Sequence, residues 1–361
     1  MIPITKPIIG EEEINKVKEV LGSGFISQGA IVDEFEEAFA SFIGTKYAIA
    51  VNSGTSALHI ALMAHGIGYE DEVITTPFTF ISTANAILFT GAKPVFIDIE
   101  PDTFNINPDQ ISDKITIKTK AIMLVHLYGQ PCDMDRIILL AKEYGLEIIE
   151  DACQAHGAEY NGKKVGSFGT GCFSFYATKN MTTGEGGMIT TNNKEIAEKA
   201  RIIRNHGQTE RYFHEILGYN YRMTDITAAL GICQLRRLVK FNDRRIENAD
   251  FLNRRLSGIK GLIVPSTKHY ARHVFHQYTI RITELFNMPR DQLREKLDSM
   301  GVATGVYYPL PIHRQPLYRN LGYDTHLPVS EEAASEVISL PVHPSLTRED
   351  LEYIAQSFIN L

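Results

Sequence analysis

The sequence predicts an α/β protein with a large domain on a mostly parallel sheet, followed by a smaller C-terminal α+β domain. Short apolar runs alternate with helical segments of about 10–15 residues, the pattern of βαβ units. These runs are continuously apolar, as expected for parallel strands that helices cover on both faces. The composition changes near Leu256 to shorter strands and loops with proline and glycine, so we expect domains over 1–255 and 256–361.

The N-terminal part begins with helices expected over 11–22 and 32–42, followed by an apolar strand over 47–51. The segment 52–62 joins a small polar turn to a helix rich in alanine and leucine. Free backbone N–H groups and the helix dipole make such a turn a potential anion site. By itself the signal is weak, because any βα turn can contain Ser-Gly-Thr.

The alternation continues through the rest of the large domain. Strands are expected over 72–76, 93–99, 120–126, 146–151 and 187–191, and helices over 84–89, 133–144, 196–203 and 226–238. Thr224 can cap the last of these helices, which can continue towards Leu256. Ser53, Phe80 and Asp151 come just after strands, where catalytic groups of parallel sheets gather. In the C-terminal domain we expect two helices, 290–300 and 348–359.

The composition is that of a soluble globular enzyme, with 44% hydrophobic and 22% charged residues among 361. A formal net charge of -7 and the lack of a basic cluster argue against a nucleic-acid surface. Four scattered cysteines indicate reduced thiols and no metal site. No apolar run approaches the roughly 20 residues of a membrane helix. The N-terminal residues lack a signal-peptide pattern, so we expect a cytoplasmic protein.

Two segments suggest a specific chemistry. Lys179 lies between an aromatic-rich run and a glycine turn, within the segment 174–188. Asp151 ends an apolar strand, with Gln154 just beyond it. A lysine before a glycine turn is by itself typical of an exposed strand end. Together with a strand-end carboxylate, however, it meets the needs of pyridoxal phosphate, namely an amine for the aldehyde and a carboxylate for the pyridine nitrogen.

These two segments resemble the DegT/DnrJ/EryC1/StrS family of sugar aminotransferases, and the resemblance extends from Pro3 to the segment 340–344. It implies a pyridoxal 5'-phosphate enzyme of fold type I that acts as a homodimer on nucleotide-linked keto-sugars. By this resemblance Lys179 forms the internal aldimine and moves the proton, and Asp151 holds the pyridinium. Gln154 would lie near the ring hydroxyl and Phe80 would stack on the ring, although core packing is an alternative for Phe80.

The resemblance also implies the residues that hold the phosphate and the substrate. The donors expected around the cofactor phosphate are Gly54, Thr55, Ser56 and Ser174, together with Asn220 from the partner subunit. Tyr308 and His313 match the substrate-side segment. Tyr307 departs from relatives that often have histidine there, and Cys153 stands where many have alanine.

The implied activity is a ping-pong transfer of an amino group from L-glutamate to a nucleotide-diphosphate keto-deoxysugar. The turn 183–187 favours members that act at C4, hence a 4-keto-6-deoxysugar. Two alternatives are a dehydratase of the same family, in which histidine replaces the lysine, and a non-catalytic regulatory or binding protein. Retention of both Lys179 and Asp151 favours the aminotransferase. The nucleotide, the aminated position and the stereochemistry stay open.

Overall fold

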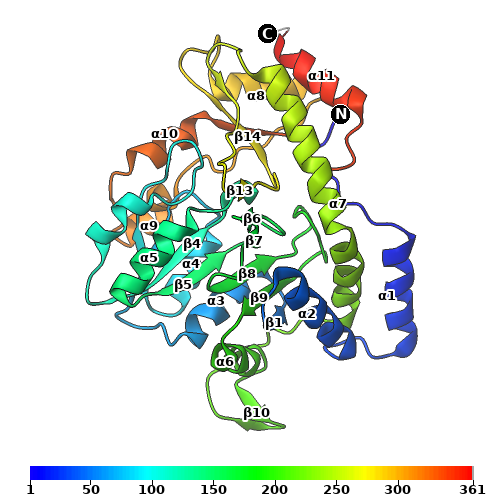
Figure 1. Cartoon of the computed structure of the whole chain (residues 1–361), viewed down its shortest axis with the longest axis vertical. Coiled ribbons are helices and arrows are strands. Elements are labelled where there is room, and N and C mark those ends of the chain that lie inside the picture. Colours follow the sequence, from blue (N-terminus) through cyan, green and yellow to red (C-terminus); the bar gives the residue numbers. More distant parts are fainter. Residues whose placement is uncertain (360–361) are drawn as a thin grey trace.

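The computed structural model describes residues 1–359 and centres on a seven-stranded sheet with the order β1-β9-β8-β5-β4-β2-β3 (Figure 1). Its strands are β1 (Tyr47–Val51), β2 (Glu72–Thr75), β3 (Lys93–Phe96), β4 (Thr119–Val125), β5 (Glu147–Asp151), β8 (Thr170–Ser174) and β9 (Gly187–Thr191). Neighbouring strands from β3 to β8 pair in parallel, whereas β9 runs antiparallel to both β8 and β1. The predicted mostly parallel sheet is therefore confirmed, and β8 is a strand that the sequence interpretation missed.

Helices cover both faces of this sheet, as the continuously apolar strands require. The helices of this part are α1 (Glu11–Ser23), α2 (Ala30–Ile43), α3 (Gly54–Ala64), α4 (Ser82–Phe89), α5 (Met134–Tyr144), α6 (Lys194–Arg204) and α7 (Asp225–Leu256). Alternate residues of β1 belong to different apolar clusters: Ile49 and Val51 pack with α3 and α6, and Ala48 and Ala50 with α2 and α7. Thr224 caps α7 as predicted, because its side chain accepts a hydrogen bond from the Thr227 N–H.

The C-terminal part is a smaller α+β unit around the antiparallel sheet β12-β14-β15. It comprises β12 (Leu262–Ile263), β14 (Tyr278–Ile282), β15 (Val337–Leu340), α8 (Arg290–Ser299), α9 (Pro316–Asn320), α10 (Pro328–Glu336) and α11 (Arg348–Ile359). The expectation of two helices here was wrong, because α9 and α10 also form. Each has proline in its first turn, where the missing N–H costs nothing, and such prolines were interpreted as loop signals.

The two parts share elements along the chain. The end of α7 packs in the apolar cluster of the C-terminal part, and its beginning packs against the large sheet. Ile2 pairs with Val302, so the N-terminus lies beside the C-terminal unit, at the same end of Figure 1 as α11. The boundary between 255 and 256, at the end of α7, remains a proposal.

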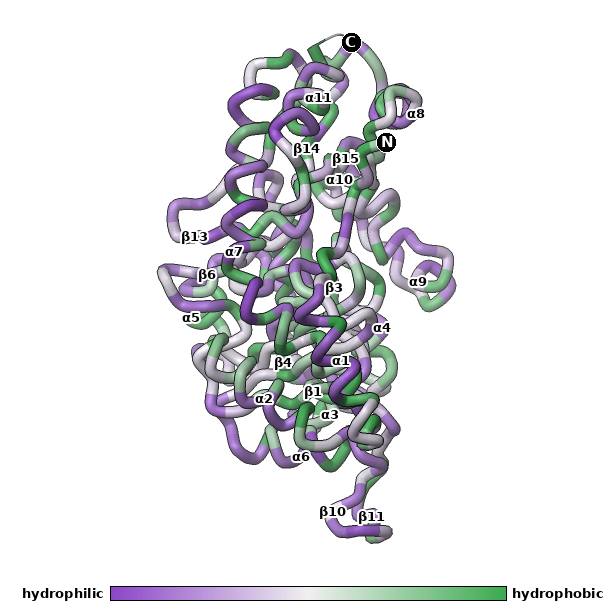
Figure 2. Tube along the Cα trace, turned by 90° about the vertical axis from the view of Figure 1, so that its right-hand side faces the viewer, coloured by the Kyte–Doolittle hydropathy of each residue, from purple (hydrophilic) through white to green (hydrophobic). Residues whose placement is uncertain are grey.

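Small elements complete the described chain. The remaining strands are β6 (Glu159–Tyr160), β7 (Lys163–Lys164), β10 (Gln208–Glu210), β11 (Phe213–His214) and β13 (Ala271–Arg272). The 3₁₀ turns are η1 (Pro108–Gln110), η2 (Ser112–Lys114), η3 (Leu127–Gly129) and η4 (Ile312–Arg314). The β10–β11 hairpin projects from the end opposite the N-terminus and α11 (Figures 1 and 2). Among residues 1–359, none of the helices combines the length and apolar composition that crossing a membrane requires.

Candidate active site

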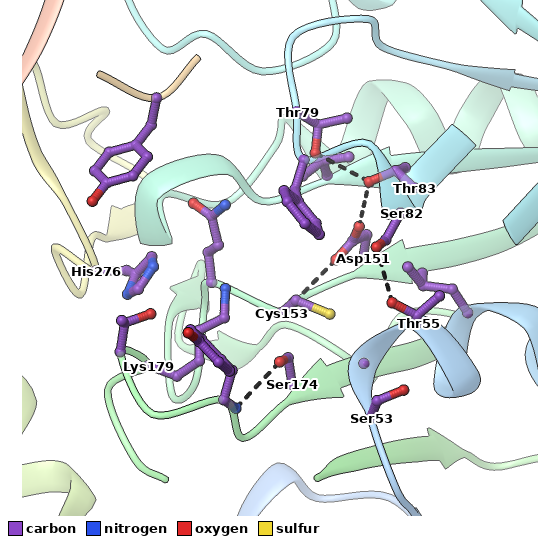
Figure 3. A pocket seen from close by; sticks show the side chains of 18 of the residues that line it. Ser53, Thr55, Thr79, Ser82, Thr83, Asp151, Cys153, Ser174, Lys179 and His276 are labelled. Atoms are coloured by element: carbon purple, nitrogen blue, oxygen red, sulfur yellow. Dashed lines mark hydrogen bonds between the residues drawn. The ribbon is translucent and has the colours of Figure 1, made fainter. Parts of the chain in front are cut away.

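A cavity of about 540 Å³ opens where β2, β4, β5 and β8 end. It brings together most of the side chains singled out in the sequence. The predicted site residues that line it are Gly54, Thr55, Phe80, Asp151, Gln154, Ser174, Lys179 and Tyr308. In Figure 3, Lys179 and His276 lie on one side, Ser53, Thr55 and Ser82 on the other, and Asp151 and Cys153 between them. The side chains that the parallel-sheet argument singled out at strand ends thus line one cavity.

Asp151 is the last residue of β5 and is only 5% exposed. Each of its carboxylate oxygens accepts one hydrogen bond: Oδ2 from the Thr83 hydroxyl at 2.7 Å, and Oδ1 from the Cys153 N–H at 3.2 Å. Donors of this kind stabilise the ionised carboxylate, which has further lone pairs. Asp151 can therefore present a negative charge to a ligand in the cavity.

Lys179 lies in the loop between β8 and β9, with its backbone N–H bonded to the Tyr176 carbonyl. Burial of its amine lowers the pKa below the usual value, and the nearby Cys153 and Asp151 oppose this only partly. A lower pKa increases the fraction of neutral amine at a given pH, and the neutral amine is the nucleophile. Lys179 is thus suited to attack a carbonyl in the cavity.

The opposite side is built from neutral donors at the start of α3. Ser53 caps this helix by accepting a hydrogen bond from the Ser56 N–H, and the N–H groups of Gly54 and Thr55 belong to the first turn, which lacks intrahelical acceptors. A Cβ on Gly54 would lie 2.7 Å from the Ser174 Cβ, so only glycine permits this close approach. Of the described residues that line the cavity, Lys179 alone is a lysine or arginine. A phosphate would therefore be bound by backbone and hydroxyl groups.

The aromatic wall is formed around Tyr308. The Gln154 amide bridges two partners, because its Oε1 accepts from the Tyr128 N–H at 2.9 Å and its Nε2 donates to the Tyr308 hydroxyl at 3.1 Å. Burial raises the pKa of Tyr308, so its hydroxyl stays protonated. Phe80 is 56% exposed, and its ring centroid lies 6.3 Å from that of Tyr308. Phe80 therefore belongs to the cavity wall and not to the core.

Three predicted site residues lie outside this lining. Ser56 is buried, and its hydroxyl donates to the Asn52 side chain at 2.6 Å. Asn220 is exposed and pairs with Asn205 in an isolated bridge. His313 is fully buried, with Nε2 at 3.0 Å from the Glu331 carboxylate.

Sequence reasoning missed several lining residues. Thr79 precedes α4 and Thr83 lies in its first turn. The Ser82 hydroxyl accepts a hydrogen bond from the Thr55 hydroxyl at 2.9 Å. His276 comes from the C-terminal half of the chain, and Nδ1 of its ring has no hydrogen-bond partner among the residues that the structure describes. Burial, reinforced by Lys179, lowers the pKa of His276 well below its usual value. The hydroxyl-rich start of α4 was a usable signal for the threonines, whereas nothing local marked His276.

This donor set fits pyridoxal phosphate. Lys179 provides the amine for its aldehyde, and Asp151 provides a carboxylate for its ring nitrogen. The N–H groups of Gly54 and Thr55, in the first turn of α3, lack intrahelical acceptors and can bind a phosphate there. The aldehyde, the ring nitrogen and the phosphate of that cofactor therefore each have a chemically matched partner in the cavity.

Comparisons with known proteins agree with this assignment. Residues 7–359 match the model of the DegT/DnrJ/EryC1/StrS aminotransferase family. The chain is 46% identical to the pleiotropic regulatory protein of Geobacillus stearothermophilus, covering 96% of this chain and 93% of that protein. It is 42% identical to the GDP-perosamine synthase of Caulobacter vibrioides, covering 98% and 96%. The structure of DesV from S. venezuelae, in complex with a ketimine intermediate, matches with a TM-score of 0.92, 38% identity and coverage of 96% and 93%.

Proposed function

This chain belongs to the DegT/DnrJ/EryC1/StrS aminotransferase family and is a sugar aminotransferase, and on that premise we propose its substrates, cofactor and assembly. We propose that it uses pyridoxal phosphate to transfer the amino group of L-glutamate to the ketone of a nucleotide-linked keto-deoxysugar, in two successive half-reactions. The observation that supports this most directly is the shared cavity of Lys179, Asp151 and the anion site of α3.

The residues of this chain have distinct roles in the proposal. Bound pyridoxal phosphate supplies an aldehyde that exchanges amines and a ring that accepts electrons. Lys179 would hold the cofactor through its amine and, as a free amine, would move a proton to or from the reacting carbon. Such general acid–base catalysis is typically worth about 10²–10⁴-fold. Asp151 would keep the ring nitrogen protonated, and the start of α3 would orient the phosphate.

The sugar substrate is proposed from the relatives and from the turn 183–187. The relative named GDP-perosamine synthase is 42% identical to this chain, which supports a nucleotide-diphosphate sugar. The turn, in which Glu185 lines the cavity, favours a 4-keto-6-deoxysugar. The dehydratase alternative is disfavoured because Lys179 stands where a dehydratase would have histidine, and the regulator alternative because Lys179 and Asp151 are both present and line one cavity.

Covalent attachment and turnover test this function. The purified protein is expected to be yellow, and borohydride reduction should fix the cofactor on the peptide containing Lys179. Mass spectrometry of reactions with glutamate and a panel of UDP-, dTDP- and GDP-linked keto-sugars should then identify the aminated product. A reduced adduct elsewhere, or a protein that takes up no cofactor, would reject the proposal, and Lys179→Ala is the matched control.

We also propose a symmetric dimer in which each site receives Asn220 from the partner. Asn220 is exposed and lies outside the cavity of its own chain, which is compatible with this role. Replacing Asn220 with aspartate should repel the cofactor phosphate and lower cofactor affinity. If Lys179→Ala and Asn220→Asp chains exchange subunits, one site of each mixed dimer is intact. Activity should return at roughly a quarter of the sites, by two-fold symmetry. No recovery, with subunit exchange confirmed, would place Asn220 in its own site or in none.

A further inference from the structure

We propose that Thr83 is a positioning residue that, with Thr79, orients the Asp151 carboxylate and stabilises its charge. This inference deepens the proposed function and rests on it, because the carboxylate in question is the group proposed to hold the cofactor ring nitrogen. Neither threonine needs to touch the cofactor for the arrangement to work. Figure 3 shows the chain of hydrogen bonds from Thr79 through Thr83 to Asp151.

The direction of these hydrogen bonds follows from counting protons. The Thr83 hydroxyl donates its single proton to Asp151 Oδ2 at 2.7 Å. Thr83 Oγ1 is also 3.1 Å from Thr79 Oγ1, and with its proton already used it can only accept there. Thr79 must therefore be the donor. Both hydroxyl dipoles then point towards the carboxylate, and hydrogen bonds in such a chain strengthen one another.

Burial makes this arrangement effective. Thr83 is completely buried, and Thr79 is 4% exposed. Little water is therefore available to replace a lost donor, and a hydrogen bond to a charged group is worth more than one between neutral groups. Thr83 lies in the first turn of α4, a fixed element, so its hydroxyl holds Oδ2 in place relative to the sheet.

The second carboxylate oxygen completes the geometry. Oδ1 accepts from the Cys153 N–H, so Asp151 is fixed by one donor on each oxygen, from two different elements. Each oxygen still has an unused lone pair, which leaves capacity for a ring N–H in the cavity. Removing Thr83 would leave the carboxylate free to rotate about its remaining bond to Cys153.

The test is a set of threonine variants. Thr83→Val keeps the shape and removes the hydroxyl, Thr83→Ser keeps the hydroxyl, and Thr79→Val removes only the outer donor. Thr75→Val is the matched control, because Thr75 is also fully buried and its hydroxyl donates to the Met123 carbonyl at 2.8 Å, away from Asp151. Each purified holoenzyme is compared for kcat, KM, thermal stability and the visible absorption spectrum of the bound cofactor as a function of pH.

We expect Thr83→Val to lower kcat about 10-fold or more with little change in KM, the usual result of losing a hydrogen bond to a charged group. The pH dependence of its cofactor spectrum should shift from that of the wild type. Thr83→Ser should stay within about threefold of wild type, with Thr79→Val between the two. Thr75→Val should affect stability but neither kcat nor the spectrum.

Two different failures can be told apart. If the wild-type protein is yellow but Thr83→Val matches it in kcat and spectrum, or Thr75→Val is equally impaired, the positioning role is wrong and the proposed function stands. If the wild-type protein takes up no pyridoxal phosphate, the proposed function fails and the positioning role fails with it.

Discussion

Glu150 and Asp151 are adjacent carboxylates on β5 with opposite surroundings. Successive side chains of a strand point to opposite faces of the sheet. Glu150 is fully buried and accepts four hydrogen bonds, from the backbone N–H groups of Gly166, Phe168 and Gly169 and from the His126 ring. Asp151 accepts only two and lines the cavity. One carboxylate is saturated by the fold, and the other has capacity left for a ligand.

The partners of Glu150 explain its charge state. Burial alone would raise its pKa, but the hydrogen bonds from His126 and the backbone outweigh burial and hold the pKa below the usual value. The His126 ring accepts the Cys132 N–H at Nδ1, at 3.0 Å, so its other nitrogen carries the proton and donates to Glu150. Glu150 thus ties the segment 166–169 to the sheet. The comparison indicates that free acceptor capacity, and not charge alone, distinguishes a functional carboxylate from a structural one.

The largest expected effect comes from Asp151→Asn. The amide cannot hold a ring nitrogen protonated by charge, so we expect a folded, coloured protein with kcat reduced on the order of 10²–10³-fold, as for other lost electrostatic contacts at a reacting centre. Its thermal unfolding should change little. Steady-state kinetics and calorimetry check this pair of outcomes, and activity within a few-fold of wild type would make Asp151 structural, like Glu150.

For Glu150→Gln we expect the reverse, a large loss of stability with little change in kcat. The side-chain NH₂ of the new glutamine would point at the N–H groups that now donate to Glu150, and it cannot accept from them. At least one of these buried N–H groups would therefore lose its hydrogen-bond partner. Such a loss in a buried charged network costs about 3 kcal/mol of unfolding free energy. The folded fraction should retain kcat within a few-fold. Denaturant unfolding and kinetics on the same preparation measure both, and a variant that is stable but inactive would contradict the division of roles.

Sequence reasoning found the sheet and the strand ends because both depend on local apolar runs. Ser53, Phe80 and Asp151 line one cavity, as expected for residues at or shortly after the carboxyl ends of parallel strands. Alternation along β5 assigns Glu150 and Asp151 to opposite faces without saying which face bears the cavity, so the choice of Asp151 depended on its place at the strand end and on the family resemblance. That depends on how α4 and the loop after β8 pack, which is long-range information.

The C-terminal half was harder for the same reason. His276 enters the cavity from a segment that follows α7, and no local pattern marks such a contact. Asn220 and His313 were assigned by family resemblance alone, and this single chain does not bring them to the cavity. A role for either depends on contacts beyond this chain or on the bound substrate.

The smallest expected effect concerns His156, a third buried polar group beyond β5. It is fully buried against Phe173 and Phe175, with ring centroids at 5.5 and 5.7 Å, and neither ring nitrogen makes a hydrogen bond of normal geometry within residues 1–359. Burial, with the nearby Lys179 charge, lowers its pKa from 6.5 to about 3. Thus Glu150 accepts hydrogen bonds at all of its lone pairs, Asp151 accepts them at some of its lone pairs, and the ring nitrogens of His156 form none of normal geometry.

The sign of the pH effect follows from this lowered pKa. Below pH 6.5 His156 binds a proton in the unfolded chain but stays neutral in the folded protein. The free energy of unfolding therefore falls as the pH falls. At about 1.4 kcal/mol per pH unit, the loss reaches about 2 kcal/mol at pH 5. His156→Leu should therefore be nearly neutral at pH 7.5 and more stable than wild type at pH 5, by urea unfolding. His269→Gln, at an exposed site, is the control that should leave the slope unchanged. An unchanged acid slope in His156→Leu would mean that the ring is protonated or solvated in the folded protein.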